Sequence, residues 1–225
     1  MSSFLLKTYH CLLNTYGPQG WWPLLKDNNN HHRNYHPGIY HFPQKPKEIF
    51  EICVGAILTQ NTNWMGVEKS LWNLKKVKGL TYSGMKKLAD TDLLQAIKPS
   101  GYFNQKAKKL RILCDNFPKW LKKTPTREEL LAIWGIGPET ADSILLYAFK
   151  VPTFVVDAYT KRILLNLNMI KEQAGYDDVK KLFEQNLPKD LIIFQEYHAL
   201  LVRHAKDHYS KRPHGANCFL RKAKK

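Results

Sequence analysis

The stretch that decides the fold reads Leu130-Leu-Ala-Ile-Trp134-Gly-Ile-Gly137-Pro-Glu-Thr140-Ala141. Its apolar residues predict two helices joined by the turn Gly135-Ile136-Gly137. Two glycines let a backbone turn tightly and approach a ligand closely, and Pro138 suits the first turn of the second helix. The free N–H groups and the positive dipole end of that helix face outwards, so the hairpin predicts a seat for phosphate groups. A helix cap with an ordinary turn is the alternative that this stretch alone leaves open.

Helical patterns continue on both sides of the hairpin. From Pro46 to about Gln60, apolar residues recur every three or four positions, and apolar neighbours of that face predict a central helix. Thr91 is expected to be an N-cap, and Thr126 to Glu129 forms a capping box that starts a short helix. Further helices are expected at 66–76, 82–89, 92–97, 101–117, 138–149, 158–168, 178–185 and 190–208. Because β-branched alternation is nearly absent, the fold class is predicted to be all-α.

Composition points to an anionic partner. The chain has 225 residues, with 35 Lys and Arg against 19 Asp and Glu, which gives a formal net charge of +16. Such an excess is most often used to bind nucleic acid and less often to bind an acidic membrane surface. The 44% of hydrophobic residues excludes disordered and fibrous classes. Apolar runs fall short of the roughly 18 residues of a membrane span, and we find no signal-peptide pattern, so a soluble cytoplasmic protein is expected.

Cysteine and histidine spacing does not predict a metal site. The four cysteines lie far apart in the chain, without paired spacing, and are expected to be reduced thiols: Cys11, Cys53, Cys114 and Cys218. Four histidines lie in or near the polar segment 27–36, at positions 31, 32, 36 and 41. They have no acidic or Cys companions, so we interpret the segment as a solvated loop. The basic end, 210–225, is expected to be frayed.

Asp157 stands twenty residues after Gly137, at the end of the apolar run Phe154-Val-Val. One interpretation is a helix N-cap, for which Asp is a common choice. The other is a carboxylate held rigidly beside the phosphate-binding hairpin, where it would stabilise a sugar cation and activate water. Position and residue type alone leave both interpretations open.

Four pieces, in their order and spacing, resemble the helix-hairpin-helix (HhH-GPD) DNA glycosylases of the endonuclease III type, over about residues 48–206. The pieces are Ile57-Leu-Thr-Gln60-Asn-Thr62, Gly101-Tyr-Phe-Asn104-Gln-Lys106-Ala107, the hairpin, and Val155-Val156-Asp157. The resemblance implies two helical domains with a DNA-binding cleft between them. Residues 45–153 would form a six-helix domain that ends in the hairpin, and residues 1–44 with 154–225 would form the second domain.

Two departures from the endonuclease III pattern bear on the chemistry. Those enzymes carry a lysine two residues after the second hairpin glycine, which attacks the sugar and makes them lyases. Here that position is Glu139, and because a carboxylate cannot form a Schiff base, no lyase activity is expected. The family also often holds an iron–sulfur cluster on four C-terminal cysteines. Only Cys218 stands in the corresponding stretch, so no cluster, no other cofactor and no metal is expected.

The motifs are most similar to the 3-methyladenine branch of the family. That branch lines its base pocket with paired aromatics near the N-terminus and with an aromatic after Gln-Asn-Thr-x. The resemblance therefore implies base contacts by Trp21, Trp22, Pro23, Trp64 and, on the last helix, Lys206. A cationic methylated base between indole rings gains roughly 1 kcal/mol from cation–π attraction. Packing in the hydrophobic core, or in a turn on it, is the alternative for Trp21 and Trp22.

The resemblance also implies catalytic and DNA-contacting residues. Asp157 would stabilise the oxocarbenium-like sugar and help water attack C1′. Gln60 and Tyr102 would fill the space left by the flipped base, as plug and wedge. The backbone of the DNA would be contacted by Lys106, Gly135, Gly137 and Thr140. Three more basic residues near Lys106 are candidates for phosphate contacts, with a solvated helix face as the alternative: Lys108, Lys109 and Arg111.

The sequence thus predicts a monofunctional DNA glycosylase that flips out alkylated purines such as 3-methyladenine and hydrolyses the N-glycosidic bond in base excision repair. Its partner would be double-stranded DNA with alkylated bases, and the enzyme is expected to be a monomer associated with the nucleoid. Two alternatives stay open. One is a glycosylase for another lesion, such as an oxidised pyrimidine or a mismatched base. The other is a non-catalytic DNA-binding module that uses the hairpin as a phosphate clamp.

Overall fold

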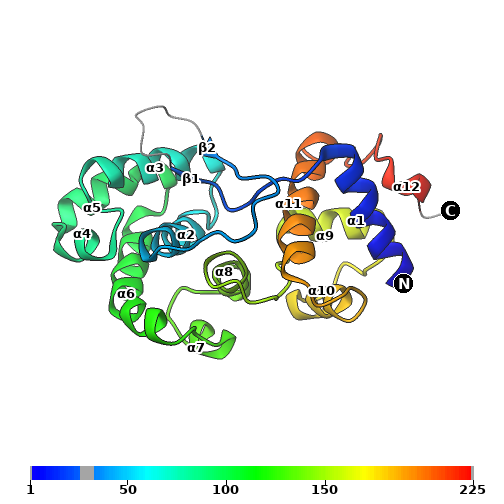
Figure 1. Cartoon of the computed structure of the whole chain (residues 1–225). Coiled ribbons are helices and arrows are strands. Elements are labelled where there is room, and N and C mark those ends of the chain that lie inside the picture. The colour runs from blue at the N-terminus through cyan, green and yellow to red at the C-terminus, as the bar shows by residue number, and fades with distance from the viewer. Residues whose placement is uncertain (1, 26–32, 224–225) are drawn as a thin grey trace. The chain divides into compact units, whose positions relative to one another are not determined.

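The computed structural model describes residues 2–25 and 33–223, and nearly all of its regular structure is helical (Figure 1). This confirms the predicted all-α class. Part of the predicted polar loop, 27–32, lies outside the described residues. The chain forms two compact units. Unit 1 comprises Met1–Trp21, Tyr35–Tyr40 and Lys150–Lys225, and unit 2 comprises Trp22–Asn34 and His41–Phe149. The predicted domain bounds differ from these units at 22–34, 41–44 and 150–153.

Unit 2 is built around one buried helix. Its elements are α2 (Pro46–Leu58), α3 (Trp64–Lys76), α4 (Tyr82–Lys87), α5 (Asp90–Ile97), η1 (Lys98–Ser100), α6 (Phe103–Lys122), α7 (Arg127–Leu131), α8 (Pro138–Ser143) and η2 (Ile144–Ala148). The predicted central helix is α2, which contacts α3, α6, α8 and η2 (Figure 1). Every residue from Ile52 to Leu58 is buried, so α2 forms the core of this unit.

Helix starts in unit 2 follow local capping signals, with one correction. In the predicted capping box of α7, the Thr126 side chain accepts from the Glu129 N–H and the Glu129 carboxylate accepts from the Thr126 N–H. The prediction of Thr91 as an N-cap is wrong, because α5 already begins at Asp90, with Ala89 as its N-cap. An acidic residue in the first turn is stabilised by the helix dipole, and this favours the earlier start.

The helix that follows the hairpin changes its winding. The sequence predicts a single helix over 138–149, whereas the structure has α8 followed directly by η2, a π-helical turn. The Phe149 N–H donates to the Ile144 carbonyl at 3.2 Å, which is the wider bond of such a turn. All five residues of η2 are buried, and Tyr147 is among them. Single π-helical turns inside helices are frequent at functional sites.

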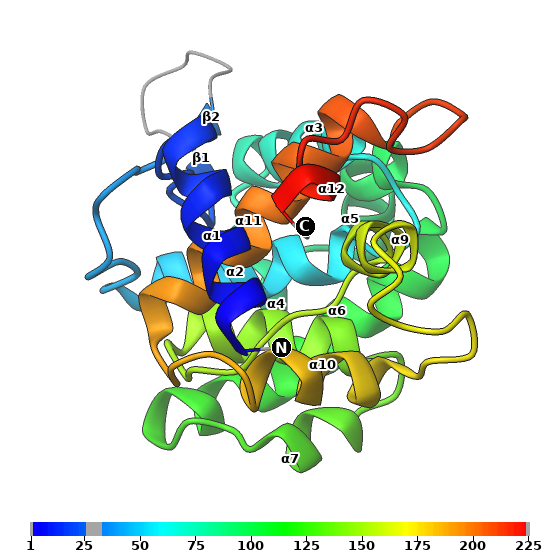
Figure 2. The same cartoon turned by 90° about the vertical axis from the view of Figure 1, so that its right-hand side faces the viewer.

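Unit 1 is organised around the long helix near its C-terminal end. Its helices are α1 (Ser2–Tyr16), α9 (Ala158–Asn166), α10 (Tyr176–Glu184), α11 (Leu191–His208) and α12 (Leu220–Ala223). Helix α11 contacts both α1 and α9 (Figure 2). Aromatic rings fill the core: Phe154 stacks on Phe183 with centroids 3.9 Å apart and meets Tyr197 edge-on. The residues just before Asp157 are therefore part of the core.

The C-terminal segment is packed as far as Leu220, which corrects the prediction that it is frayed there. Tyr209, Cys218 and Leu220 are buried. The Cys218 Sγ lies 3.2 Å from His204 Nε2, and His204 Nδ1 lies 3.1 Å from the Tyr16 hydroxyl. These contacts join α1, α11 and the segment after α11. Burial of apolar side chains outweighs the basic composition of this segment.

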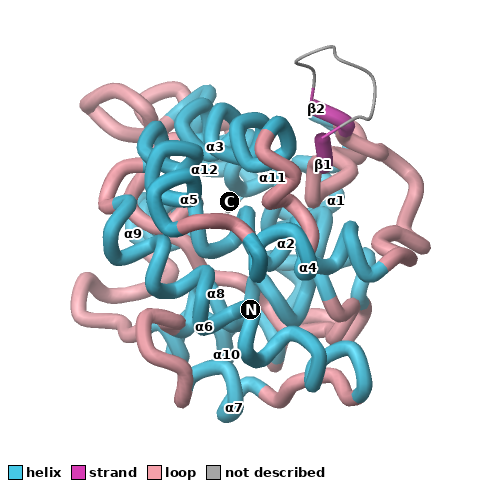
Figure 3. Tube along the Cα trace, turned by 90° about the vertical axis from the view of Figure 1, so that its left-hand side faces the viewer, coloured by secondary structure: helices cyan, strands magenta, loops and turns pink. Residues whose placement is uncertain are grey.

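The strands among the described residues are β1 (Leu24–Leu25) and β2 (Arg33–Asn34), an antiparallel pair that Figure 3 shows in magenta. The pairing joins Leu24 to Asn34 and Leu25 to Arg33. The Leu25 N–H also donates to Glu51 Oε1 at 2.7 Å, which ties the pair to α2. No helix of 2–25 or 33–223 is long and apolar enough to cross a membrane.

Candidate functional site

Asp157 is the N-cap of α9, and its two carboxylate oxygens have different surroundings. Oδ1 accepts hydrogen bonds from the backbone N–H and the hydroxyl of Thr160, at 2.7 and 2.8 Å. Oδ2 lies 4.0 Å from His198 Nε2, and within 2–25 and 33–223 no group donates a hydrogen bond to it. The side chain is 14% exposed. The cap interpretation is therefore confirmed for one oxygen, while the other is able to face a water molecule or a developing positive charge.

The chain before Asp157 is held by α10 through two hydrogen bonds. The Phe154 N–H donates to Glu184 Oε1 at 2.8 Å, and the Val156 N–H donates to the Tyr176 hydroxyl at 3.3 Å. The side chains of Phe154 and Val156 are buried. Because the chain is anchored before Asp157 and capped after it, the carboxylate is preorganised, which is the condition for electrostatic stabilisation of a transition state.

His198 of α11 contacts both the carboxylate and an indole of unit 1, and the sequence interpretation missed it. Its Nε2 faces Asp157, and its ring meets Trp21 edge-on with centroids 5.6 Å apart. Burial lowers the pKa of His198, and the charge of Asp157 opposes this shift. The imidazole is therefore neutral at pH 7 and leaves the carboxylate charge uncancelled. A polar residue inside the apolar run 191–201 was the signal that could have found it.

Glu196, also missed from the sequence, fixes the chain just before Trp21. Its carboxylate is 2% exposed and accepts from the N–H groups of Gln19 at 2.6 Å and Gly20 at 3.2 Å. Gly20 has φ +64, and a Cβ there would lie 2.2 Å from the backbone nitrogen of Pro37, so only glycine fits. Helix α11 therefore determines where Trp21 lies within unit 1.

Unit 2 holds the other predicted base-binding aromatics close together. The rings of Trp22 and Trp64 have centroids 5.7 Å apart, and Trp22 meets Tyr147 of η2 at 5.4 Å. Gly55 of α2 permits this packing, since a Cβ there would lie 3.1 Å from Trp22 Nε1. Trp22 and Pro23 are buried, and Trp64 is half-buried. The Trp64 Nε1 is shielded from solvent and has no acceptor among the described residues. This buried indole donor therefore has its hydrogen bond unmade within 2–25 and 33–223.

The predicted hairpin lies between α7 and α8, and its apex is exposed. Gly135 has φ +84, a conformation that favours glycine, and the buried side chain of Ile136 anchors the turn. Gly137, Pro138 and Glu139 are exposed. A Cβ on Gly137 would meet no atom of the described residues within 4 Å. The main chain at the apex is thus open to a phosphate group.

The predicted plug residue Gln60 is tied to this hairpin. Its Nε2 donates to the Gly135 carbonyl at 3.0 Å and to Thr140 Oγ1 at 2.9 Å, and its Oε1 accepts from the Lys109 ammonium. Thr140 is only 7% exposed. Its side chain orients Gln60, whereas a direct phosphate contact would need it at the surface. Three predicted DNA-contacting residues are therefore brought together here.

Two basic residues of α6 do not occupy the surface positions expected for phosphate contacts. Lys106 is 1% exposed, and its ammonium donates to the carbonyls of Leu58 and Ser100. Arg111 donates to the Asp90 carboxylate and to two backbone carbonyls. The prediction of Lys106 as a DNA contact is therefore corrected, because its ammonium is buried and donates to carbonyls inside unit 2. Arg111 likewise ties the end of α4 and the start of α5 to α6.

Exposed side chains remain near the hairpin and on α11. The predicted wedge Tyr102 is 65% exposed and has φ +46. Trp134 at the hairpin is 50% exposed, and the ammonium of exposed Lys108 lies 4.4 Å from its ring centroid. Lys206 is exposed in the last turn of α11. These exposed side chains are therefore accessible to a partner, as the predicted wedge and base-contact roles of Tyr102 and Lys206 require.

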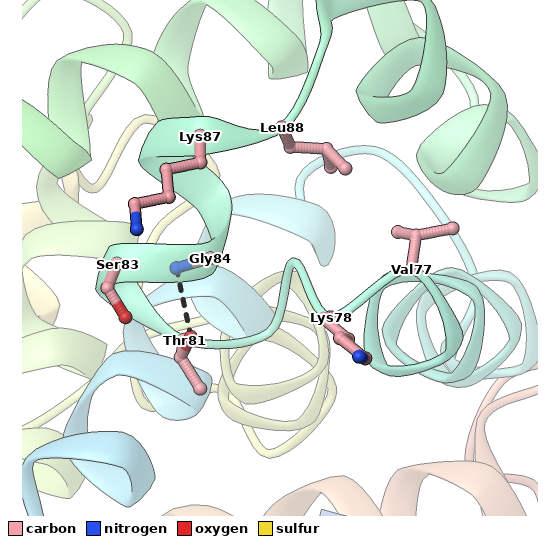
Figure 4. A pocket seen from close by; sticks show the side chains of 7 residues that line it. All are labelled: Val77, Lys78, Thr81, Ser83, Gly84, Lys87 and Leu88. Carbon is pink, nitrogen blue, oxygen red and sulfur yellow. Dashed lines mark hydrogen bonds between the residues drawn. The ribbon is translucent and has the colours of Figure 1, made fainter.

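A hollow of about 400 Å³ lies at the start of α4 (Figure 4). Its lining residues are Val77, Lys78, Thr81, Ser83, Gly84, Lys87 and Leu88. The Thr81 hydroxyl accepts from the Gly84 N–H, and a Cβ on Gly84 would lie 1.8 Å from the Lys78 carbonyl. This hollow is a product of a tight turn, and none of the predicted site residues lines it.

Metal-binding groups are not gathered anywhere in the part of the chain that the structure describes, where no three His, Cys, Asp or Glu residues are placed to hold an ion. Cys218 is the single cysteine of residues 209–225, and its thiol contacts His204. An iron–sulfur cluster needs four such ligands, so this donor set does not fit one.

The chain is similar to known DNA repair proteins in sequence. The family model described as HhH-GPD superfamily base excision DNA repair protein matches residues 54–189. A protein of Methanocaldococcus jannaschii that is provisionally named a DNA repair glycosylase is 40% identical over 228 residues, covering 96% of this chain and 94% of that protein. Endonuclease III of Thermotoga maritima is 31% identical over 160 residues, covering 68% of this chain and 73% of that protein.

Solved structures share the fold. A 3-methyladenine DNA glycosylase of H. pylori bound to 1,N6-ethenoadenine has a TM-score of 0.70 and 28% identity, covering 92% of this chain and 97% of that chain. A non-covalent endonuclease III–DNA complex has a TM-score of 0.73 and 19% identity, covering 100% of this chain and 97% of that chain. The second likeness concerns the fold alone.

Proposed function

Because the chain belongs to the HhH-GPD superfamily of base excision DNA repair proteins and is a DNA glycosylase, we propose that it releases alkylated purines, 3-methyladenine among them, by hydrolysis. The observation that carries the proposal is the geometry of Asp157. One oxygen is fixed by the cap, the other accepts no hydrogen bond from the described residues, and the neighbouring His198 is neutral. A fixed negative charge of this kind stabilises a positive charge that develops on a sugar.

In the proposed reaction, the bond between C1′ and the purine nitrogen breaks, and its electron pair leaves with the base. The methylated base is cationic and becomes neutral on leaving, so it needs no proton from a general acid. The sugar becomes oxocarbenium-like and is stabilised by Asp157. Water then adds to C1′ and loses its proton to the carboxylate or to solvent. A single carboxylate is therefore sufficient for this reaction.

Base selection in this proposal uses indole side chains. Trp21 of unit 1 contacts His198, and Trp22 contacts Trp64 in unit 2. Electron-rich indole faces attract a cationic purine more strongly than a neutral one. Pro23 and Lys206 are the other two residues that we propose as base contacts. Similarity to the 3-methyladenine glycosylase of H. pylori supports this choice of lesion.

DNA binding in this proposal uses the open hairpin apex, where main-chain N–H groups meet phosphates without reading sequence. The partner is double-stranded DNA that carries alkylated bases. We further propose that the enzyme acts as a monomer in the nucleoid and uses no iron–sulfur cluster or other cofactor. Glu139 occupies the position of the lyase lysine and cannot form a Schiff base, so strand cleavage by that route is not proposed.

The test is the identity of the bases released from methylated duplex DNA, separated by chromatography. We expect free 3-methyladenine from the wild type, a loss of at least about 100-fold in Asp157→Asn, and no covalent adduct after borohydride treatment. Asp115→Asn, at an exposed position of α6, is the matched control and should keep the wild-type rate. Release of an oxidised pyrimidine with a trapped adduct would favour the endonuclease III-type alternative. Binding without any base release would favour the non-catalytic module.

A further inference from the structure

Lys106 is a buried lysine whose ammonium joins two distant segments of unit 2. It is 1% exposed, and its Nζ donates to the Leu58 carbonyl at 2.9 Å and to the Ser100 carbonyl at 2.6 Å. Burial lowers the pKa of Lys106 to about 8, and the charge of Lys109 adds to the shift. Lysines are almost never buried so completely, because the charged form loses its hydration. The hydrogen bonds of Lys106 must therefore compensate for the hydration that its ammonium loses.

Both acceptors end a helix, and each stands two residues before a predicted DNA-inserting residue. Leu58 is the last residue of α2, and Gln60 follows two positions later. Ser100 is the last residue of η1, and Tyr102 follows two positions later. Carbonyls at helix ends lack partners within their own helix and are free to accept other donors. One ammonium thus links the two backbone segments that carry Gln60 and Tyr102.

The end of α2 is also tied to the hairpin on another side. The Gln60 amide donates to the Gly135 carbonyl and to Thr140 Oγ1. Hydrogen bonds therefore hold three segments of unit 2 in fixed positions relative to one another: the hairpin, the end of α2 and the turn before α6. The Lys106 contacts connect the end of α2 to the turn that carries Tyr102.

We propose that Lys106 is a positioning residue for base flipping, because its ammonium sets the spacing between the backbones of Gln60 and Tyr102. This inference rests on the proposed function, in which these two side chains enter the duplex around one vacated site. Lys106 then contacts no phosphate and takes no part in bond breaking. Its loss should change the distortion of DNA and leave the affinity for undamaged duplex unchanged.

The test compares Lys106→Met with Lys122→Met, which removes the same charge from an exposed position at the end of α6. The probe is a duplex with a tetrahydrofuran abasic analogue and an adjacent 2-aminopurine, whose fluorescence rises when stacking is lost. We expect Lys106→Met to bind undamaged duplex within about threefold of wild type, to lose most of the fluorescence rise, and to release methylated base about 100-fold more slowly in single turnover. Lys122→Met should match the wild type in all three measurements.

Unchanged fluorescence in a folded Lys106→Met protein would overturn the proposal. If Lys106→Met lost affinity for undamaged duplex as strongly as it lost the fluorescence rise, the proposal would also be overturned, since Lys106 would then contribute to DNA binding itself. If circular dichroism shows that Lys106→Met is unfolded, Lys106→Gln decides, because its amide is one atom shorter than the lysine side chain and carries no charge to hold the two carbonyls. Full fluorescence in that variant would refute the inference. The fluorescence needs no bond breaking. A wild-type protein that distorts the probe but releases no base would refute the proposed reaction and leave this test intact.

Discussion

Asp157 uses one carboxylate oxygen as a helix cap and leaves the other to the proposed reaction, so two substitutions can separate these roles. Asn keeps an oxygen that can accept the Thr160 N–H, whereas Ala removes the cap. We expect Asp157→Ala to lower the free energy of unfolding by about 1 kcal/mol, and Asp157→Asn to lower it much less. Both variants should lose base release. Urea unfolding and single-turnover assays measure the two effects. Equal destabilisation by Asn and Ala would contradict the cap geometry.

Lys106 shows what the sequence leaves undecided at a single residue. The buried face of α6 includes Leu110, Leu113 and Phe117, and position 106 lies one turn before Leu110 on that face. Helical spacing therefore points Lys106 inwards, while the rarity of buried lysine favours the surface. The outcome depends on two carbonyls from other segments of unit 2. A local pattern does not contain these partners, so the surface prediction for this residue failed.

The two hairpin glycines should respond differently to alanine. Gly135 has φ +84, and a Cβ would lie 2.4 Å from Lys109 Cε. We expect Gly135→Ala to lower the free energy of unfolding by about 1–2 kcal/mol. Gly137 has φ −91 and open space around it, so Gly137→Ala should keep the fold. Its methyl group would stand between a phosphate and the main chain and weaken duplex binding about tenfold. Urea unfolding and fluorescence anisotropy at one salt concentration measure these effects. Wild-type affinity in Gly137→Ala would exclude the apex as a DNA contact.

The ends of helices were predictable where local residues, such as a capping box, a proline or a glycine turn, mark them. The capping box at Thr126, the first-turn Pro46 and the glycine turn of the hairpin each place a helix end as the structure has it. The π-helical turn η2 was not predictable, because all five of its residues are hydrophobic and their pattern does not distinguish an α-helical from a π-helical turn. The end of the chain was misjudged, because its buried residues find their partners on α11. Local chemistry thus determines where helices start, and tertiary contacts determine how some of them continue.

In the molecule as a whole, the candidate site depends on contacts between residues far apart in the chain. The resemblance supplied Asp157 and Trp21, because each lies in a motif. His198 and Glu196, which contact or fix these residues, lie in no motif and come from α11. Glu196 and Gly20 are separated by 176 positions, so only folding brings them together. Sequence patterns could therefore propose the reacting group, whereas the residues that hold it required the structure.

The stability of the folded chain should fall in weak acid, because two buried histidines of unit 1 are neutral. Burial lowers the pKa of His204 to about 4, and burial also lowers the pKa of His198. In the unfolded chain both pKa values return to about 6.5, so below that pH the unfolded state binds more protons than the folded state. The free energy of unfolding is therefore highest above about pH 6.5 and decreases as pH falls towards 4, by at most about 1.4 kcal/mol per pH unit for each histidine.

Urea unfolding at about pH 7.5, 6 and 5 measures this slope. In His204→Gln the amide can still meet Tyr16 and Cys218 but does not titrate, so the slope should be shallower than in the wild type. His10 is exposed, and His10→Gln should keep the wild-type slope. A wild-type slope in His204→Gln would mean that proton uptake elsewhere governs acid stability. Loss of the slope in that variant alone would place the acid sensitivity in the contacts that join α1, α11 and the C-terminal segment.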